Sequence, residues 1–199
     1  MLREAGAIFA KRGFHAASMD EIAERVGVSK PVIYTAFGSK EALYFAYIES
    51  AGADLLDAMV AAAQLSRAGQ VQERLHAGAL AFFTFVDEHR DGYAVLFSEL
   101  AARGGPFRRE VSAIRRQIVA LTKVLLDEVV EEAGEDGARL GGTEALAQAF
   151  VGAGESLANW WLENPDARVE DITGRLMNIT WLGLDALLRG RAAPWPTGQ

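Results

Sequence analysis

The segment Lys30–Lys40 has a composition suited to hydrogen bonding with nucleic acid. Its sequence, KPVIYTAFGSK, holds two lysines, a tyrosine and a threonine but no acidic residue. A lysine ammonium group can donate to guanine O6 or N7, and small or apolar side chains can contact thymine methyl groups. Carboxylates on the same surface would repel the phosphates, so their absence favours contact with DNA. On a helical wheel the side chains that face outward are Pro31, Val32, Thr35 and Ala36, with Tyr34 at the border.

Two short helices joined by a tight turn are predicted to position this segment. Ser18 and Glu21 bound the sequence SMDE, a capping box in which each side chain bonds a free backbone N–H of the first turn. Gly27 suits the left-handed conformation that ends a helix. The next helix follows after about two residues, with Ser29 as its N-cap and Pro31 in its first turn. This order of helix, short glycine-containing turn and helix predicts a helix-turn-helix.

Two further helices flank the predicted helix-turn-helix. One is expected over residues 2–11, where Gly13 ends it and Phe14 turns back into the core. The other begins near Ser39 and runs to about residue 63, and we expect the two domains to share it. A three-helix bundle whose second turn is merely tight remains an alternative to DNA binding at this point.

The segment FHAASMDEIAERVGVSKPVIYTAFGSKEALYFAYIE resembles the DNA-binding segment of the TetR family of transcriptional regulators. The matching features are an aromatic residue after the glycine of the first helix, IA, GVSK, Tyr34, Phe37 and SKEAL. They cover about residues 2–48. The resemblance implies an all-α effector domain of about six helices after this segment, and a homodimer. It divides the chain into a DNA-binding domain, residues 1–46, and a ligand-binding and dimerisation domain, residues 47–199.

The resemblance also implies roles for seven residues toward a double-stranded DNA operator. Those that fall where the family reads bases are Lys30, Pro31, Val32 and Thr35. Those that fall where it contacts phosphates are Ser18, Tyr34 and Lys40. Two departures bear on the expected contacts. Ala36 stands where many relatives have His or Tyr. The given sequence also begins at once with the first helix, so the basic arm of many relatives is either naturally absent or trimmed from the start.

The charge distribution is compatible with a DNA-binding head on an acidic body. The net charge is −7, but residues 1–48 carry six basic and five acidic residues, and residues 49–199 carry the remaining fourteen and twenty-two. An uneven distribution of this kind favours a small DNA-reading domain attached to a larger one with another task.

The sequence offers little for catalysis or metal binding. It has no Cys and three dispersed His, and it contains no phosphate loop, dinucleotide fingerprint or nucleophile elbow. His89 lies near Asp87, Glu88 and Asp91, a cluster best interpreted as a solvated helix end. We therefore expect no enzyme, no cofactor and no metal. No apolar run approaches the roughly 18 residues of a membrane span, and the start does not resemble a signal peptide, so we expect a cytoplasmic protein without a membrane partner.

The apolar stripes after residue 47 predict a helical core that could hold an unknown small-molecule effector, apolar or aromatic in character. About nine helices are expected in the whole chain, which makes the fold class all-α. An ordinary core would use the same side chains. The candidate ligand-binding residues are Phe82, Phe83, Tyr93, Phe97, Gln117, Leu121, Phe150, Asn159 and Trp161, with Thr122 and Glu155 as further polar contacts.

The last helix, near residues 168–189, has apolar side chains on two faces, which predicts burial on two faces. One face would pack on its own domain and the other on a second copy in a two-fold homodimer. The predicted interface residues are Phe150, Gly154, Leu157, Ile179, Gly183 and Leu187. Two recognition helices 34–36 Å apart would then meet successive major grooves of a near-palindromic operator.

The favoured function is therefore a DNA-binding regulator, predicted to be a repressor that a ligand releases from its operator. A helical ligand-binding or protein-interaction module without DNA function is the alternative.

Overall fold

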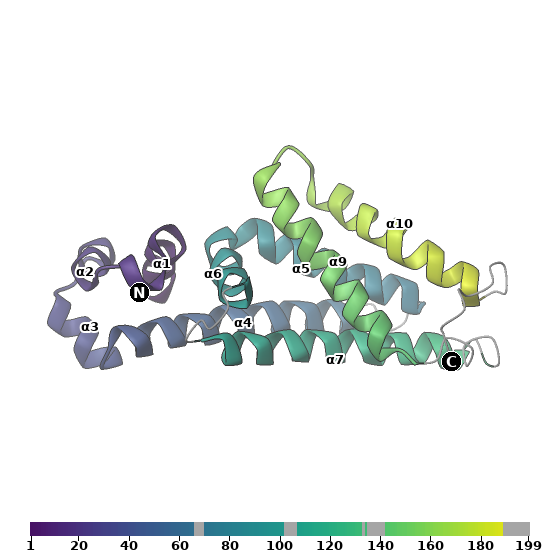
Figure 1. Ribbon diagram of the computed structural model, residues 1–199, viewed down its shortest axis with the longest axis horizontal. Helices are drawn as coiled ribbons and strands as arrows, with labels where there is room; N and C mark the ends of the chain where they lie inside the picture. Colours follow the sequence, from purple (N-terminus) through teal and green to yellow (C-terminus); the bar gives the residue numbers. More distant parts are fainter. Residues whose placement is uncertain (66–69, 102–106, 133, 135–141, 189–199) are drawn as a thin grey trace. The chain divides into compact units, whose positions relative to one another are not determined.

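The computed structural model describes residues 1–65, 70–101, 107–132, 134 and 142–188 of the chain. Within these residues the secondary structure consists of nine helices and no strand, which confirms the predicted all-α fold (Figure 1). The helices are α1 Leu2–Ala16, α2 Met19–Val26, α3 Lys30–Phe37, α4 Lys40–Leu65, α5 Val71–Glu88, α6 Arg90–Ala101, α7 Arg108–Glu132, α9 Glu144–Glu163 and α10 Val169–Leu188.

The helices form two compact units. The first comprises Met1–Leu56 with Phe85–Arg115, and the second comprises the described parts of 57–84 and 116–199. Helices α4, α5 and α7 each contribute residues to both units. The unit that contains the helix-turn-helix thus extends beyond residue 46 along α4 and takes in α6. The boundary between residues 46 and 47 stays a prediction.

Helix α1 is longer than its sequence pattern predicts. It continues past Lys11 to Ala16, with a kink at Gly13, whose φ of 72° is in the left-handed region. Glycine adopts this conformation without the steric penalty of a Cβ. The kink turns Phe14 toward the core, where it packs half-buried against the buried residues, as expected.

The tight turn between α2 and α3 is built as the sequence predicts. The Ser18 hydroxyl accepts from the Asp20 backbone N–H at 3.2 Å, and Gly27 ends α2 with a φ of 77°. One half of the predicted capping box is not formed, because Glu21 accepts instead from Arg12 at 3.4 Å. Ser29 occupies the N-cap position of α3, but its side chain makes no capping hydrogen bond.

An aromatic cluster joins three segments of the first unit: α1, α4 and the residue before α7. The ring centroids of Phe9 and Tyr44 are 4.7 Å apart, and that of Phe107 lies 4.8 Å from Tyr44 and 5.4 Å from Phe14. Edge-to-face aromatic pairs add to the stabilisation that burial of the rings supplies. The cluster therefore ties the residue before α7 to α1 and α4, which support the helix-turn-helix.

The second unit is organised around Trp161 of α9. Its indole ring is buried beside Phe83 of α5 at 6.2 Å, and its Nε1 donates to the Ala167 carbonyl oxygen at 2.8 Å. Helix α10 packs on α9, where Leu176 lies beside Gly154. Arg74 of α5 forms an ion pair with Glu128 of α7. These contacts hold four helices around one apolar core.

Candidate nucleic-acid interface and effector cavity

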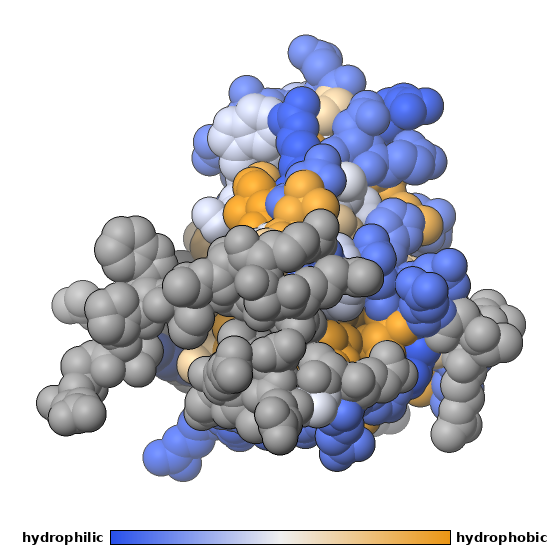
Figure 2. Space-filling view, turned by 90° about the vertical axis from the view of Figure 1, so that its right-hand side faces the viewer, coloured by the Kyte–Doolittle hydropathy of each residue, from blue (hydrophilic) through white to orange (hydrophobic). Residues whose placement is uncertain are grey.

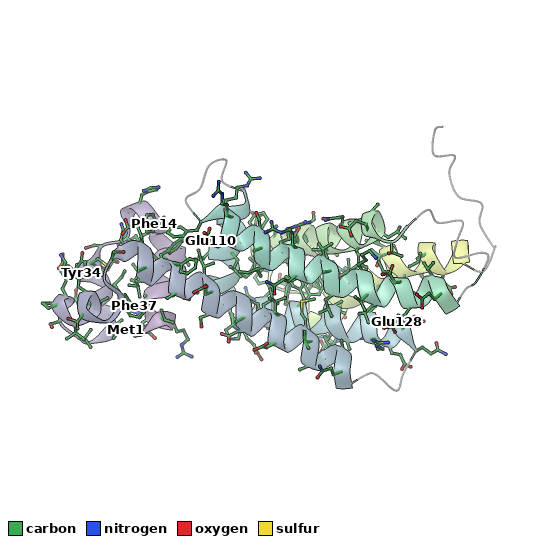
Figure 3. All side chains as sticks on the ribbon, turned by 90° about the horizontal axis from the view of Figure 1, so that it is seen from below. Met1, Phe14, Tyr34, Phe37, Glu110 and Glu128 are labelled. Carbon is green, nitrogen blue, oxygen red and sulfur yellow. The ribbon has the colours of Figure 1, made fainter. Side chains whose placement is uncertain are left out.

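Helix α3 presents an exposed face without acidic side chains. Ile33 is fully buried, whereas Val32 is 46% exposed and Tyr34 is 41% exposed. Pro31, Thr35 and Ala36 are exposed as well. The inward and outward positions of the helical wheel are therefore confirmed. Tyr34 is labelled in Figure 3, on the short helix that follows the turn.

Two of the polar residues on or beside α3 make contacts inside the protein. The ammonium group of Lys30 bonds Asp20 of α2 at 3.0 Å, and this hydrogen bond raises the pKa of Lys30 above its usual value. The Thr35 hydroxyl donates to the Pro31 carbonyl oxygen at 2.9 Å, which leaves its oxygen free to accept. Asp20 uses one of the three N–H donors of the Lys30 ammonium group, and the predicted contact of Lys30 with DNA stays a prediction.

Lys40 has a structural role that sequence reasoning missed. Its Nζ donates to the carbonyl oxygens of His15 at 3.2 Å and Ala17 at 3.1 Å, and it lies 4.8 Å from the centroid of the Phe14 ring. The last carbonyl groups of a helix have no partner within the helix. Lys40 satisfies two such groups around the end of α1, and its predicted phosphate contact stays a prediction.

The second unit contains a small apolar cavity among α4, α5, α7, α9 and α10. Its volume is about 50 Å³, well below the roughly 300–1,000 Å³ of typical ligand sites. Three predicted ligand-binding residues, Phe82, Leu121 and Phe150, line it, together with Thr122 and Glu155. The cavity residues absent from the predicted site are Met59, Ala63, Leu75, Gly78, Ala79, Ile118, Leu125, Val151, Gly154 and Leu176. Most belong to apolar stripes, and periodicity alone does not separate cavity lining from packed core.

The other six predicted ligand-binding residues lie outside this lining. Phe83 and Trp161 pack on each other in the core beside it. Asn159 donates to the Glu155 carbonyl oxygen at 2.8 Å, and Gln117 is exposed. Tyr93 and Phe97 belong to α6 of the first unit, where their rings stack at 6.2 Å.

The predicted dimer residues divide between the surface and the core. Ile179 is 70% exposed, and the neighbouring Leu182, which the prediction omitted, is 60% exposed. Gly183 is exposed and Leu157 is half-buried. Gly154 and Phe150 face the cavity within the protomer. The side chain of Leu187 lies outside the described residues. Figure 2 shows apolar side chains grouped among hydrophilic ones on the side where α10 ends.

The described residues contain no group of three side chains placed to hold a metal ion. None of the helices they form is both long and apolar enough to cross a membrane.

Comparison with known proteins gives the same assignment for both parts of the chain. Residues 1–47 match the family of bacterial regulatory proteins named tetR, and residues 71–183 match the tetracyclin repressor-like C-terminal domain. The transcriptional activator FasR of Mycolicibacterium smegmatis is 32% identical over 164 residues, which cover 82% of this chain and 71% of FasR.

Solved structures have the same fold over almost the whole chain. A TetR-like regulator from Rhodococcus sp. RHA1 is 30% identical with a TM-score of 0.76, covering 92% of this chain and 93% of that one. The regulator FadR of Bacillus subtilis, solved with stearoyl-CoA, is 19% identical with a TM-score of 0.72, covering 95% and 96%. These relatives are transcriptional regulators rather than enzymes. From its exposed recognition helix, its helical second unit and these matches, the chain belongs to the TetR family of DNA-binding transcriptional regulators.

Proposed function

We propose that this regulator binds a near-palindromic operator as a homodimer, with one α3 in each of two successive major grooves, and that an apolar ligand of the second unit controls it. The exposed face of α3 carries the proposal. Val32, Thr35 and Tyr34 project from a helix with no acidic residue, while Ile33 anchors the helix in the core. Such a face can approach base edges without repelling phosphates.

The chemistry of the cavity indicates the ligand class. Its lining is largely aliphatic, with Phe82 and Phe150 as aromatic members and Thr122 and Glu155 as polar ones. The Thr122 hydroxyl already donates to the Ile118 carbonyl oxygen at 3.0 Å. A mainly hydrocarbon ligand fits this lining. A fold of the same kind holds stearoyl-CoA in FadR, although at that identity the likeness carries no residue correspondence.

In this proposal, the small volume of the cavity links ligand binding to a movement of the helices that line it. A ligand larger than a few atoms must separate helices to enter about 50 Å³. Helices α4, α5 and α7, which line the cavity, continue into the unit that contains the helix-turn-helix. A ligand that binds the expanded arrangement more tightly shifts the population toward it. Coupling between ligand binding and the helix-turn-helix thus needs only that the shared helices move as rigid elements when the cavity expands.

The effect of the ligand on operator affinity shows whether the protein represses or activates transcription. We predict repression with release by ligand, whereas the related FasR is named an activator. A repressor loses operator affinity when the ligand binds, and a ligand-dependent activator gains it.

Fluorescence anisotropy tests the proposal. The protein is titrated against the DNA upstream of its own gene and against a scrambled duplex, at several salt concentrations. We expect tighter binding to the upstream DNA and a steep loss of affinity as salt rises. Saturated fatty acids of increasing chain length and aromatic carboxylic acids, each as the free acid and as the CoA ester, are then added to the complex, and the change in anisotropy is measured.

Tyr34→Ala should weaken operator binding about tenfold while the protein stays folded. The reason is the loss of a predicted hydrogen bond from the uncharged tyrosine hydroxyl group to a DNA phosphate. The matched control is Val124→Ala, which removes an exposed side chain from α7. The proposed interface would be rejected if Tyr34→Ala and the control bound the operator equally. It would also be rejected if both duplexes bound equally at every salt concentration and a broad operator library gave the same result. Either result would favour a module without DNA function.

A further inference from the structure

The first unit contains a second concave site, unrelated to the apolar cavity. It is a groove of about 610 Å³, bounded by the start of α1, the end of α2, the middle of α4, the end of α5 and the start of α6. This volume is within the range of small-molecule sites. All of its lining residues belong to the first unit, and none lines the apolar cavity. We call it the acidic groove.

The charged side chains of the acidic groove have an excess of carboxylates. Five acidic residues and three arginines line it, a balance of −2. Two of the arginines are already neutralised: Arg25 donates to Glu4 at 2.8 Å and Arg90 to Asp87 at 2.7 Å. Asp54 and Glu88 form no ion pair within the part of the chain that the structure describes. Asp91 interacts with Arg25 only at longer range.

Tyr47 supplies a second, independent feature. Its side chain is only 7% exposed, yet it lines the acidic groove. Gly6 leaves the space that the ring occupies, and a Cβ on Gly92 would lie 3.4 Å from the hydroxyl oxygen. No described residue forms a hydrogen bond with that hydroxyl group. The hydroxyl oxygen is not among the fully buried polar atoms without a partner, so it is accessible from the groove that Tyr47 lines and can accept or donate a hydrogen bond there.

The electrostatic surroundings of Tyr47 agree with a site for positive charge. Burial, and then the negative charge of Asp91, raise the pKa of Tyr47 to about 12. The hydroxyl is therefore neutral at physiological pH, and its oxygen can accept from an N–H donor.

The same features exclude two other ligand classes. No three candidate metal ligands come together among the described residues, and the volume is much larger than a bare cation needs. An anion would meet the unpaired carboxylates of Asp54 and Glu88 in a lining whose charge balance is −2. An organic cation with several ammonium groups matches the spread of negative charge, the hydroxyl acceptor and the volume.

We propose that the acidic groove binds a small organic polycation, whose ammonium groups are held by Asp54, Glu88 and Asp91 and by the Tyr47 hydroxyl oxygen. The site adjoins α1 and the end of α2. A bound polycation would compete with Arg25 for Glu4, and so acts on the ion pair that joins α2 to α1. The proposal does not depend on the apolar effector.

Isothermal titration calorimetry of the full chain with spermidine tests this site without DNA. We expect one spermidine per protomer, with an affinity that falls as salt rises. Asp54→Asn should weaken binding several-fold, and the double variant Asp54→Asn/Glu88→Gln about tenfold, in line with ion pairs made by exposed carboxylates. Tyr47→Phe keeps the ring that fills the space at Gly6 and should still weaken binding about threefold through the lost hydrogen bond.

The matched control is Glu49→Gln, which removes an exposed carboxylate from α4 outside the groove. It should bind spermidine like the unmodified protein. Magnesium chloride at equal ionic strength should give no saturable heat. Circular dichroism checks that each variant is folded. The proposal is overturned if spermidine gives no saturable binding, if Glu49→Gln weakens it as much as Asp54→Asn, or if magnesium binds in its place.

Discussion

At the scale of the residue, the polar groups around α3 are held in place before any DNA arrives. Lys30 bonds Asp20, and Lys40 bonds the carbonyl oxygens of His15 and Ala17. Sequence reasoning assigned both lysines to DNA because their type and position fit the family. It could not find their intramolecular partners, since these carbonyl and carboxylate groups are distant in sequence and become neighbours only after α1 and α2 fold. Tyr34 and Val32 differ, because they keep 41% and 46% of their surface exposed.

The role of Lys40 leads to a stability prediction. Lys40→Met should lower the free energy of unfolding by about 1 kcal/mol, because two carbonyl groups lose a charged donor at a partly exposed site. Lys11→Met is the matched control, since Lys11 is exposed on the same unit. Urea unfolding followed by circular dichroism measures both. If the two variants have equal stability, the contacts of Lys40 with the end of α1 contribute nothing measurable.

At the scale of the element, glycines decide how closely the helices of the first unit approach. Gly13, Gly27 and Gly38 have positive φ and end or kink helices, which the sequence indicated. Gly6 and Gly52 have another purpose that no local pattern reveals. A Cβ on Gly6 would overlap the Tyr47 ring, and one on Gly52 would overlap Ile114. These positions permit the packing of α1, α4 and α7 within the unit.

Gly6→Ala tests this packing against helix propensity. In an open helical position, alanine stabilises by about 1 kcal/mol relative to glycine. At Gly6 the overlap with Tyr47 should reverse the sign and destabilise by about 1–3 kcal/mol. Gly152→Ala is the control, because a Cβ there meets nothing within 4 Å. Thermal unfolding should show a lower midpoint for Gly6→Ala and an equal or higher one for Gly152→Ala. A stabilised Gly6→Ala protein would mean that the ring of Tyr47 moves aside at little cost.

At the scale of the whole molecule, the exposed apolar side chains of α10 indicate a protein–protein interface. Ile179 and Leu182 are among the most exposed large apolar side chains of the described chain. They lie on the helix whose second apolar face predicted a dimer. Exposed apolar surface of this kind marks interaction sites in soluble proteins. The proposed homodimer would cover it and would place two copies of α3 for operator binding.

Ile179→Glu combined with Leu182→Glu should convert the proposed dimer to a monomer. Two carboxylates buried in an interface without partners carry a high desolvation cost. Light scattering after gel filtration measures the mass, and operator affinity should fall together with dimerisation. Val124→Glu, an equally polar change at an exposed apolar side chain of α7, should leave the mass unchanged. A double variant that stays dimeric would place the interface elsewhere.

The sequence by itself determined the helices, the tight turn and the outward face of α3. These depend on local rules: capping, glycine conformations and a period of 3.6 residues. The tertiary structure decided which apolar side chains enclose a cavity. It placed Phe82 and Leu121 in the lining but Tyr93 and Phe97 in the other unit, because a helical stripe specifies a buried face and not the neighbour that buries it. It alone assembled the acidic groove, since Glu4, Tyr47 and Glu88 lie on three helices far apart in the chain. Sites formed between elements depend on distances that no local pattern encodes.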